Sequence, residues 1–397
     1  MLLPVDEALS RVLKGAQKTE PINLPLHEAD GYTLAKDITS TRTQPPFATS
    51  AMDGYAVRHT DLALGKPLQI IGEAAAGHRF SGTLQAQSAV RIFTGAPLPD
   101  GADTILVQED ADREGDTITP REIPKSGLFV RPAGMDFNEN EKLIDAGTVL
   151  NFQSLSISAA MNHPTLPVHK KPIVGIISNG DELVMPGGAP NEDQIIASNA
   201  FGVASLVRAA GGKPLDLGIA HDTTADILNA FDRAQEAGCD VLVTLGGASV
   251  GDHDLIKPAL TQKGITLDFW KIAMRPGKPF MFGMLDNMRM LGMPGNPVSS
   301  LVCALLFLRP LLLTMQGRNP AYELDTALVG TPIAKNSMRP AYLRAHAAKV
   351  DGKWVVETFA DQDSSLLSVL AKSNCLVLRD SYAEPAKVGD TCTIMWI

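Results

Sequence analysis

Short apolar runs alternate with amphipathic stretches between residues 172 and 317, and this rhythm restricts the fold more than any other feature of the chain. The apolar runs predict strands at 173–177, 215–220, 240–245, 267–272, 280–285 and 289–293. Helical periods lie at 198–210, 223–236, 253–262 and 298–315. Strands that alternate with helices predict a parallel sheet covered on both faces, as in a doubly wound α/β domain.

The flanking regions have a different pattern. Residues 4–14 predict a helix, because Pro4 suits a first turn and apolar residues recur along one face. Short apolar runs broken by Gly, Pro and Asp predict a mostly β region at 21–140 and a small separate β domain at 325–397. The predicted fold class is therefore multidomain, α/β plus β.

Composition excludes some classes of partner. The chain carries a formal net charge of −9, which argues against nucleic acid because its binding proteins present a basic face. The longest apolar run, 298–308, has about half of the roughly 20 residues that cross a bilayer, and Arg309–Pro310 ends it. The first residues are acidic where a secretory signal is basic. We expect a cytoplasmic protein without a membrane partner, whose four cysteines are small hydrophobic side chains.

The sequence TLGGASVGDHD at 244–254 follows a predicted strand. Ligands of doubly wound sheets bind where the strands end, so this turn is a candidate wall of a site. Gly246, Gly247 and Gly251 let backbone N–H groups approach a phosphate, and Ser249 adds a hydroxyl. A flexible glycine turn is the alternative, because the motif is neither a Walker loop nor GxGxxG.

Carboxylates follow the same strand ends, at Asp181, Glu182, Asp222, Asp252 and Asp254. Beside a phosphate they would repel it, unless a hard cation such as Mg²⁺ took oxygen ligands from both sides. Helix capping is the alternative role for any one of them. Their convergence favours a metal site.

A cationic segment, KIAMRPGKP, follows the strand predicted at 267–272. Lys271, Arg275 and Lys278 would bind an oxyanion, and a solvated basic loop is the alternative. Pro294 and Pro297 shape the next strand-to-helix turn, either as a wall of the site or as simple punctuation.

Seven segments, taken in order, resemble the molybdopterin molybdenumtransferase family, whose members insert molybdate into the pterin dithiolene. They are SAMDGYAV at 50–57, RIFTGAP at 91–97, RPAGMD at 131–136, SNGDELV at 178–184, TLGGASVGDHD at 244–254, FWKIAMRPGKPF at 269–280 and GMPGNPVSS at 292–300. The resemblance implies four domains: a helical linker domain from 1–20 and 141–171, an inserted β domain at 21–140, a molybdopterin-binding-like α/β domain at 172–317, and a C-terminal β-barrel-like domain at 318–397.

The resemblance also implies a reaction. Molybdate and adenylylated molybdopterin are the substrates, AMP leaves, and Mg²⁺ assists. The implied catalytic residues are Glu182, Asp53, Thr94 and Asp136. The implied substrate-binding residues are Gly246, Gly247, Ser249, Gly251, Lys271, Arg275, Lys278, Pro294 and Pro297. The implied metal ligands are Asp222, Asp254 and Glu182. The family is typically a homodimer with its active site between subunits, and the adenylyltransferase of the preceding step is a possible partner.

Two positions depart from the family pattern. Arg275 stands where some members have Lys, which keeps the charge and adds a planar fork. Asn179 stands where many have Thr, which removes a hydroxyl near Glu182. Two other functions remain open: a molybdopterin adenylyltransferase, which would consume ATP, and a non-catalytic pterin-binding scaffold, as in domains related to the C-terminal domain of gephyrin.

Overall fold

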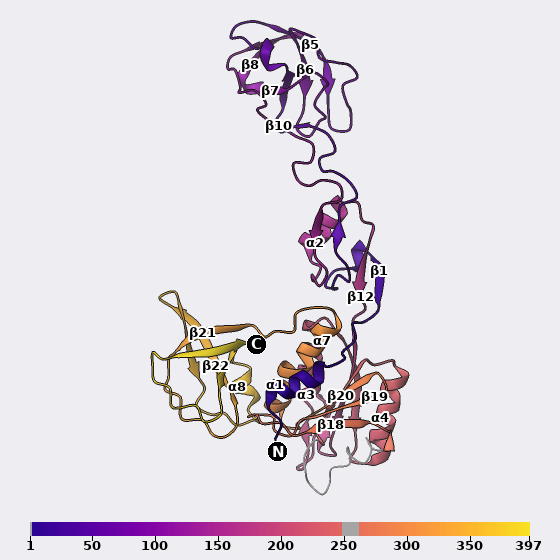
Figure 1. Ribbon diagram of the computed structural model, residues 1–397, viewed down its shortest axis with the longest axis vertical. Helices are drawn as coiled ribbons and strands as arrows, with labels where there is room; N and C mark the ends of the chain where they lie inside the picture. Colours follow the sequence, from indigo (N-terminus) through magenta and orange to yellow (C-terminus); the bar gives the residue numbers. More distant parts are fainter. Residues whose placement is uncertain (1, 248–261) are drawn as a thin grey trace.

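The computed structural model describes residues 2–247 and 262–397. The chain is elongated, as Figure 1 shows. A β unit that contains β4 to β9 forms one end, and a small unit with α2, β1 and β12 lies in the middle. The α/β sheet and the C-terminal barrel lie side by side at the other end.

A six-stranded sheet of order β16-β13-β17-β20-β19-β18 forms the α/β unit. Its strands are β13 (Ile173–Asn179), β16 (Lys213–Ala220), β17 (Val241–Leu245), β18 (Thr266–Trp270), β19 (Met281–Leu285) and β20 (Met288–Met293). The first four strands in that order are parallel, whereas β19 runs antiparallel to both neighbours. A tight turn at Asp286 (φ 53°) joins β19 to β20.

The expectation of a wholly parallel sheet was therefore wrong at this edge, because only two residues separate β19 from β20 and no helix can cross between them. Strand β18 returns to the parallel direction, because it is antiparallel to β19. Its carboxyl end therefore lies at the same edge as those of β13, β17 and β20.

Helices cover both faces of the sheet. Helices α1 (Val5–Leu13), α3 (Asn199–Ala209), α6 (Pro297–Cys303) and α7 (Arg309–Met315) contribute to one buried cluster. Helix α4 (Thr224–Glu236), whose first turn is capped by the Thr223 hydroxyl, covers the other face. The fold class is thus multidomain α/β plus β with a doubly wound centre. The helix predicted at 253–262 falls almost wholly outside the described residues.

A π-helical segment, η4 (Ala304–Leu308), joins α6 to α7, so the helical path continues through Arg309 and Pro310 to Met315. Pro310 sits at the start of α7, where its missing N–H is tolerated after the looser π turn. By length and composition, Pro297–Met315 is the one helix among the described residues that could cross a membrane (hydropathy 2.0), but 78% of its apolar window is buried within the protein.

The N-terminal helix α1 packs with the α/β unit and not with α2. Its apolar residues Val5, Ala8 and Val12 join the core that α7 also lines. Arg289 at the start of β20 donates to the carbonyls of Val12 (2.7 Å) and Lys14 (3.0 Å). The structure therefore differs from a single helical unit built from 1–20 and 141–171.

The middle unit forms by long-range pairing. Strand β1 (Pro21–Pro25) pairs with β12 (Thr165–His169), and β2 (Ile38–Thr39) pairs with β11 (Lys142–Ile144). Together with helix α2 (Phe152–Ala160) they enclose their own core. Residues 21–39 therefore belong to this linker unit, whereas the sequence division had placed them in the inserted β domain.

The inserted domain is a six-stranded sheet of order β7-β4-β6-β5-β9-β8 with two extra short strands. Its strands are β3 (Thr49–Ser50), β4 (Gly54–Val57), β5 (Leu68–Ala74), β6 (Ser88–Ile92), β7 (Thr104–Val107), β8 (Ala111–Glu114), β9 (Thr117–Pro120) and β10 (Val130–Arg131). The inserted domain also contains two short 3₁₀ turns, η2 (His59–Asp61) and η3 (Gln108–Asp110), and the linker unit contains a third, η1 (Leu26–Glu28).

The C-terminal domain is a closed barrel of order β21-β23-β22-β24-β25, which confirms the barrel-like expectation. Its elements are β21 (Leu324–Val329), β22 (Ala341–Val350), β23 (Lys353–Thr358), α8 (Leu367–Leu370), β24 (Cys375–Arg379) and β25 (Thr391–Trp396). All four cysteines are free, and Cys239, Cys303 and Cys375 are buried as small hydrophobic side chains.

Candidate active site

A cleft of about 650 Å³ lies at the edge of the α/β sheet where β13, β17 and β20 end. The ends of these strands supply one wall, and the C-terminal barrel supplies another. This is the crevice in which ligands of doubly wound sheets bind. Most of the described residues that were expected to act on the α/β side line it.

The glycine turn after β17 brings three backbone segments together. Gly246 has a φ of 96°, and a Cβ there would lie 2.6 Å from the carbonyl oxygen of Asn179. A Cβ on Gly295 would lie 3.7 Å from the Gly246 Cα. Gly246 and Gly247 both line the cleft, so their backbone is available to a ligand. Ser249 and Gly251 lie outside the described residues.

Two acidic residues of the α/β domain, Glu182 and Asp222, line the cleft, and both are exposed. The nearby Asp181 instead accepts from His221 Nδ1 (3.0 Å) and from the Asp222 N–H (3.2 Å). That bond positions the Asp222 backbone at the end of β16. Asp252 and Asp254 are outside the described residues, and the described part of the chain contains no group of three candidate metal-binding side chains.

Two of the three expected cations line the cleft, namely Arg275 and Lys278, and both are exposed. Lys271 does not line it. Lys271 has a positive φ of 90°, and its Nζ lies 6.0 Å from the centre of the Trp270 ring. The backbone of Lys271 is in the left-handed region just after β18, and of these two cations only Arg275 lines the cleft.

The barrel contributes Arg339, Gln362, Asp363 and Ser364 to the cleft, none of which the sequence had singled out. The Arg275 N–H donates to Pro340 O (2.9 Å), which docks the cationic segment on the barrel.

The turn that contains Pro294 and Pro297 is tied to the barrel in the same way. Asn296 Nδ2 donates to Ser364 Oγ (2.7 Å), and the Val298 N–H donates to Ser364 O (3.0 Å). Buried Arg344 holds the same loop by donating to Asp363 O (2.7 Å). No local pattern marks these residues, because their role depends on how two distant domains dock.

A second cavity of about 310 Å³ adjoins the cleft and shares Asn179, Glu182 and Gly295 with it. Pro297 and the apolar ribbon of β14 (Leu183–Val184) and β15 (Ile195–Ile196) also line it. Asn179 is 5% exposed, and neither of its side-chain polar atoms has a hydrogen-bond partner in the described chain. An unsatisfied buried amide is costly, which marks Asn179 as unusual.

The inserted domain carries a separate group of candidate residues. Asp53 Oδ1 accepts from the Thr94 N–H (2.7 Å) and from Thr94 Oγ1 (2.8 Å). These two bonds, with a smaller contribution from the charge of Arg91, lower the pKa of Asp53. Asp136 is exposed near the linker unit, and its N–H donates to Gln44 O (3.0 Å). None of these residues lines the cleft, because the linker unit separates the inserted domain from the α/β sheet (Figure 1).

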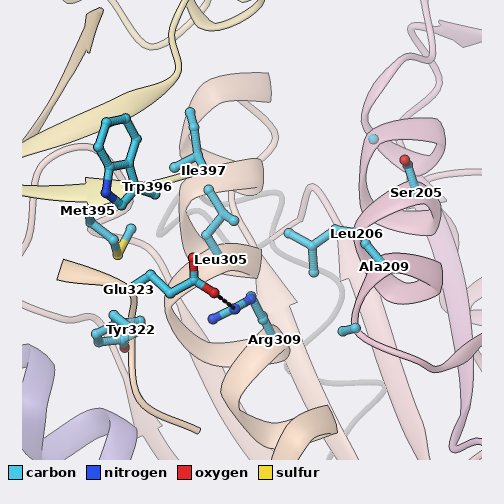
Figure 2. A pocket seen from close by; sticks show the side chains of 12 residues that line it. Ser205, Leu206, Ala209, Leu305, Arg309, Tyr322, Glu323, Met395, Trp396 and Ile397 are labelled. Atoms are coloured by element: carbon cyan, nitrogen blue, oxygen red, sulfur yellow. Dashed lines mark ion pairs between the residues drawn. The ribbon is translucent and has the colours of Figure 1, made fainter. Parts of the chain in front are cut away.

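Another cavity, of about 460 Å³, lies between α3 and the C-terminal residues Trp396 and Ile397 (Figure 2). Its charged groups are Arg309 and Glu323, which form an ion pair of 3.8 Å. None of the residues expected to act chemically lines this cavity. It is a crevice between the α/β domain and the barrel.

Comparison with known proteins identifies the class of this fold. Residues 3–162 match the MoeA N-terminal region (domain I and II), residues 175–314 match a probable molybdopterin binding domain, and residues 326–396 match the MoeA C-terminal region (domain IV). The structure also resembles that of the molybdopterin biosynthesis MoeA protein from Pyrococcus horikoshii, with a TM-score of 0.86, 27% identity, and coverage of 100% of this chain and 99% of that one.

Curated relatives give the family. A molybdopterin molybdenumtransferase of Haemophilus influenzae is 35% identical over 99% of this chain and 98% of its own length. A molybdopterin molybdenumtransferase of Nostoc is 33% identical over 92% of this chain and 86% of its own length. The chain belongs to the molybdopterin molybdenumtransferase family, transferases of molybdenum cofactor biosynthesis.

Proposed function

We infer that this enzyme inserts molybdate into adenylylated molybdopterin and releases AMP in a Mg²⁺-dependent reaction in the cytoplasm. The observation that carries the inference is the cleft at the carboxyl edge of the sheet, where a glycine turn, two free carboxylates and three cations converge. Glycine backbone suits a phosphate, cations suit molybdate, and carboxylates suit a hard metal or a water. A substrate that joins a nucleotide to a pterin needs all three.

The cations serve the two anionic substrates. Arg275, Lys278 and Arg339 face one cavity from two domains. An oxyanion held among them is brought beside the pterin, which converts the slow encounter of two anions into a positioned one. Lys271 was expected to share this role, and it remains a proposal that the segment rearranges around bound molybdate.

The adjoining cavity suits the pterin itself. It is partly apolar, through Leu183, Ile195 and Ile196, and it contains the unsatisfied amide of Asn179. A pterin ring has hydrogen-bond donors and acceptors that could pair with such an amide. Pro297 closes this cavity, so its proposed role is to shape the pterin site.

The carboxylates fit Mg²⁺ by the chemistry of their donors, because Glu182 and Asp222 offer exposed oxygens at one cleft. Asp254 is the third proposed ligand. Bound Mg²⁺ would offset phosphate charge at the scissile pyrophosphate. Glu182 is also the proposed residue that orients the attacking water, with its carboxylate accepting a hydrogen bond from that water. The glycine turn at Gly246 and Gly247, extended by Ser249 and Gly251, holds the phosphates through backbone N–H groups.

The proposed active enzyme is a homodimer. Asp53, Thr94 and Asp136 lie on parts of the chain that the linker unit holds away from the cleft of the same chain (Figure 1). If they act in catalysis, they reach a cleft on a second copy. The adenylyltransferase of the preceding step is a further proposed partner, because it would hand over its adenylylated product directly.

The test is AMP release from purified adenylylated molybdopterin, measured by chromatography with and without molybdate and Mg²⁺. We expect release only when both are present, and we expect Glu182→Gln to lower it by at least ~100-fold. Glu192→Gln, an exposed carboxylate away from the cleft lining, serves as the matched control.

Other outcomes would contradict the proposal. Consumption of ATP with molybdopterin would identify an adenylyltransferase. Tight pterin binding without molybdate-dependent turnover would identify a scaffold.

A further inference from the structure

The carboxylate of Asp53 is held by one oxygen only. Both hydrogen bonds from Thr94, from its N–H at 2.7 Å and from its hydroxyl at 2.8 Å, go to Oδ1. Asp53 is half-buried, and among the described residues no hydrogen bond is formed by its Oδ2. A carboxylate fixed in this way presents one oxygen in a defined direction, provided that the backbone beneath it cannot turn.

The backbone on both sides of the Asp53 side chain is also fixed. Asp53 O accepts from the Gln108 N–H (3.2 Å), and Gly54 O accepts from Arg91 Nη1 (3.1 Å). A Cβ on Gly54 would lie 2.2 Å from Leu106 O, so this strand passes very close to β7. At the Gly54 carbonyl, the Arg91 side chain holds the backbone next to Asp53.

Arg91 is well placed for that control. Its Nη2 donates to Gln108 Oε1 (2.7 Å), and its guanidinium lies 4.7 Å from the Phe93 ring centre and 5.1 Å from that of Tyr55. Tyr55 is buried, at 4% exposed, and belongs to a core cluster of the inserted domain, whereas Phe93 is half-buried. A planar guanidinium can stack between rings and donate along two directions, which an ammonium cannot do.

Arg91 also affects the ionisation of Asp53. Its positive charge lowers the pKa of Asp53, in addition to the two larger effects of Thr94. The short segment from Arg91 to Thr94 therefore contacts the Gly54 carbonyl through Arg91 and the Asp53 carboxylate through Thr94. The established activity and the proposed catalytic set assign nothing to Arg91.

We propose that Arg91 is a positioning residue that links the Gly54 carbonyl to Gln108 and so orients Asp53 for the reaction. This role rests on the proposed function, because it matters only if Asp53 takes part in turnover. Arg91 need not touch substrate. It keeps the Asp53 carboxylate ionised and in a fixed orientation when the inserted domain docks at the cleft of a second copy.

The experiment compares Arg91→Met and Arg91→Lys with Arg113→Met, a matched control in the same domain whose guanidinium donates to the nearby Gly115 O. The first readout needs no activity: the methyl NMR signal of Thr94 is followed against pH, so that it reports the ionisation of Asp53. In Arg91→Met we expect the midpoint to move to higher pH, while Arg113→Met keeps the wild-type midpoint.

The second readout is turnover. We expect Arg91→Met to lower kcat by about 10-fold or more with KM nearly unchanged, because misplacement of a reacting group slows chemistry and not binding. Arg91→Lys should restore the midpoint by its charge but recover only part of kcat, since it lacks the fork. If Arg91→Met fails to fold, Gln108→Leu takes its place. It removes the Gln108 contact but keeps Arg91, and we expect it to lower kcat as well.

The outcomes separate the two claims. An unchanged Thr94 midpoint and unchanged kcat in a folded Arg91→Met protein would overturn the role of Arg91. Equal recovery of kcat by Lys would also overturn it, because charge alone would then suffice. A shifted midpoint in a protein whose wild type shows no molybdate-dependent turnover would support the positioning of Asp53 by Arg91 and remove the proposed function.

Discussion

The link between β20 and the N-terminal helix gives the sharpest stability prediction. Arg289 is 5% exposed and donates two hydrogen bonds to carbonyls at the C-terminal end of α1. Burial lowers the pKa of Arg289, because a charge with little access to water is disfavoured. Arg289→Met removes both bonds and leaves the carbonyls of Val12 and Lys14 unpaired.

The magnitude follows from those two bonds. A hydrogen bond to a charged group contributes about 1.5–3 kcal/mol, so the loss should reach roughly 3 kcal/mol even at the lower limit. Since 1.4 kcal/mol is tenfold, amide exchange of α1 should accelerate by about 100-fold under native conditions. Hydrogen exchange followed by mass spectrometry on peptides that cover Val5–Leu13 measures this directly.

The effect should extend to the cleft. Leu3 N–H donates to Lys271 O (3.4 Å) and the Ala273 N–H donates to Leu3 O (2.7 Å), so the start of the chain supports the cationic segment. The matched control is Arg233→Met, whose guanidinium donates to Leu217 O (3.0 Å) on the opposite face of the sheet. An α1 exchange rate within about 5-fold of wild type in Arg289→Met would refute the reasoning.

Three further predictions follow. Asn179→Leu should raise stability by about 1 kcal/mol by removing a buried unsatisfied amide, while it weakens pterin binding; a lower melting temperature would contradict this. Thr94→Val removes one of the bonds that lower the pKa of Asp53, so the acid limb of the pH–kcat profile should move to higher pH, and an unmoved limb would count against ionised Asp53 in turnover. Burial raises the pKa of Asp240, so its contribution to stability is present at acid pH and is lost as pH rises through that pKa. Asp240→Asn keeps an oxygen that can accept from the Ile173 N–H, but it does not ionise. The variant should therefore flatten the pH dependence of the free energy of unfolding in denaturant titrations at pH 4 to 7, about the span from the unfolded pKa upwards.

Local patterns were sufficient for most of the α/β domain. Apolar runs of defined length and helical periods predicted strands and helices close to their observed bounds. The same rhythm did not reveal that β19 is antiparallel, because strand direction depends on the connection and not on the apolar pattern of the strand. The predicted boundary between the linker unit and the inserted domain, at residue 21, was wrong for a similar reason. Strand β1 pairs with a strand about 140 residues away, and no local pattern indicates such a long-range pairing.

The candidate site was predictable where its residues follow strand ends. Glu182, Asp222, Arg275 and Lys278 line one cleft because parallel strands end at one edge. Arg339 and the loop around Ser364 could not be found in this way, because they reach the cleft only when the barrel docks. The sequence pattern also did not reveal that Lys271 has a positive φ and lies outside the cleft lining.

The central claim is that Asp53 of one chain completes the cleft that contains Glu182 of another. Its most direct test mixes two inactive variants, Asp53→Asn and Glu182→Gln, after dissociation and reassociation, and measures molybdate-dependent AMP release. Recovery to about a quarter of wild-type turnover is expected, since half of the random dimers are mixed and each holds one intact cleft. Failure to recover any turnover, with mixed dimers shown to form, would contradict the account.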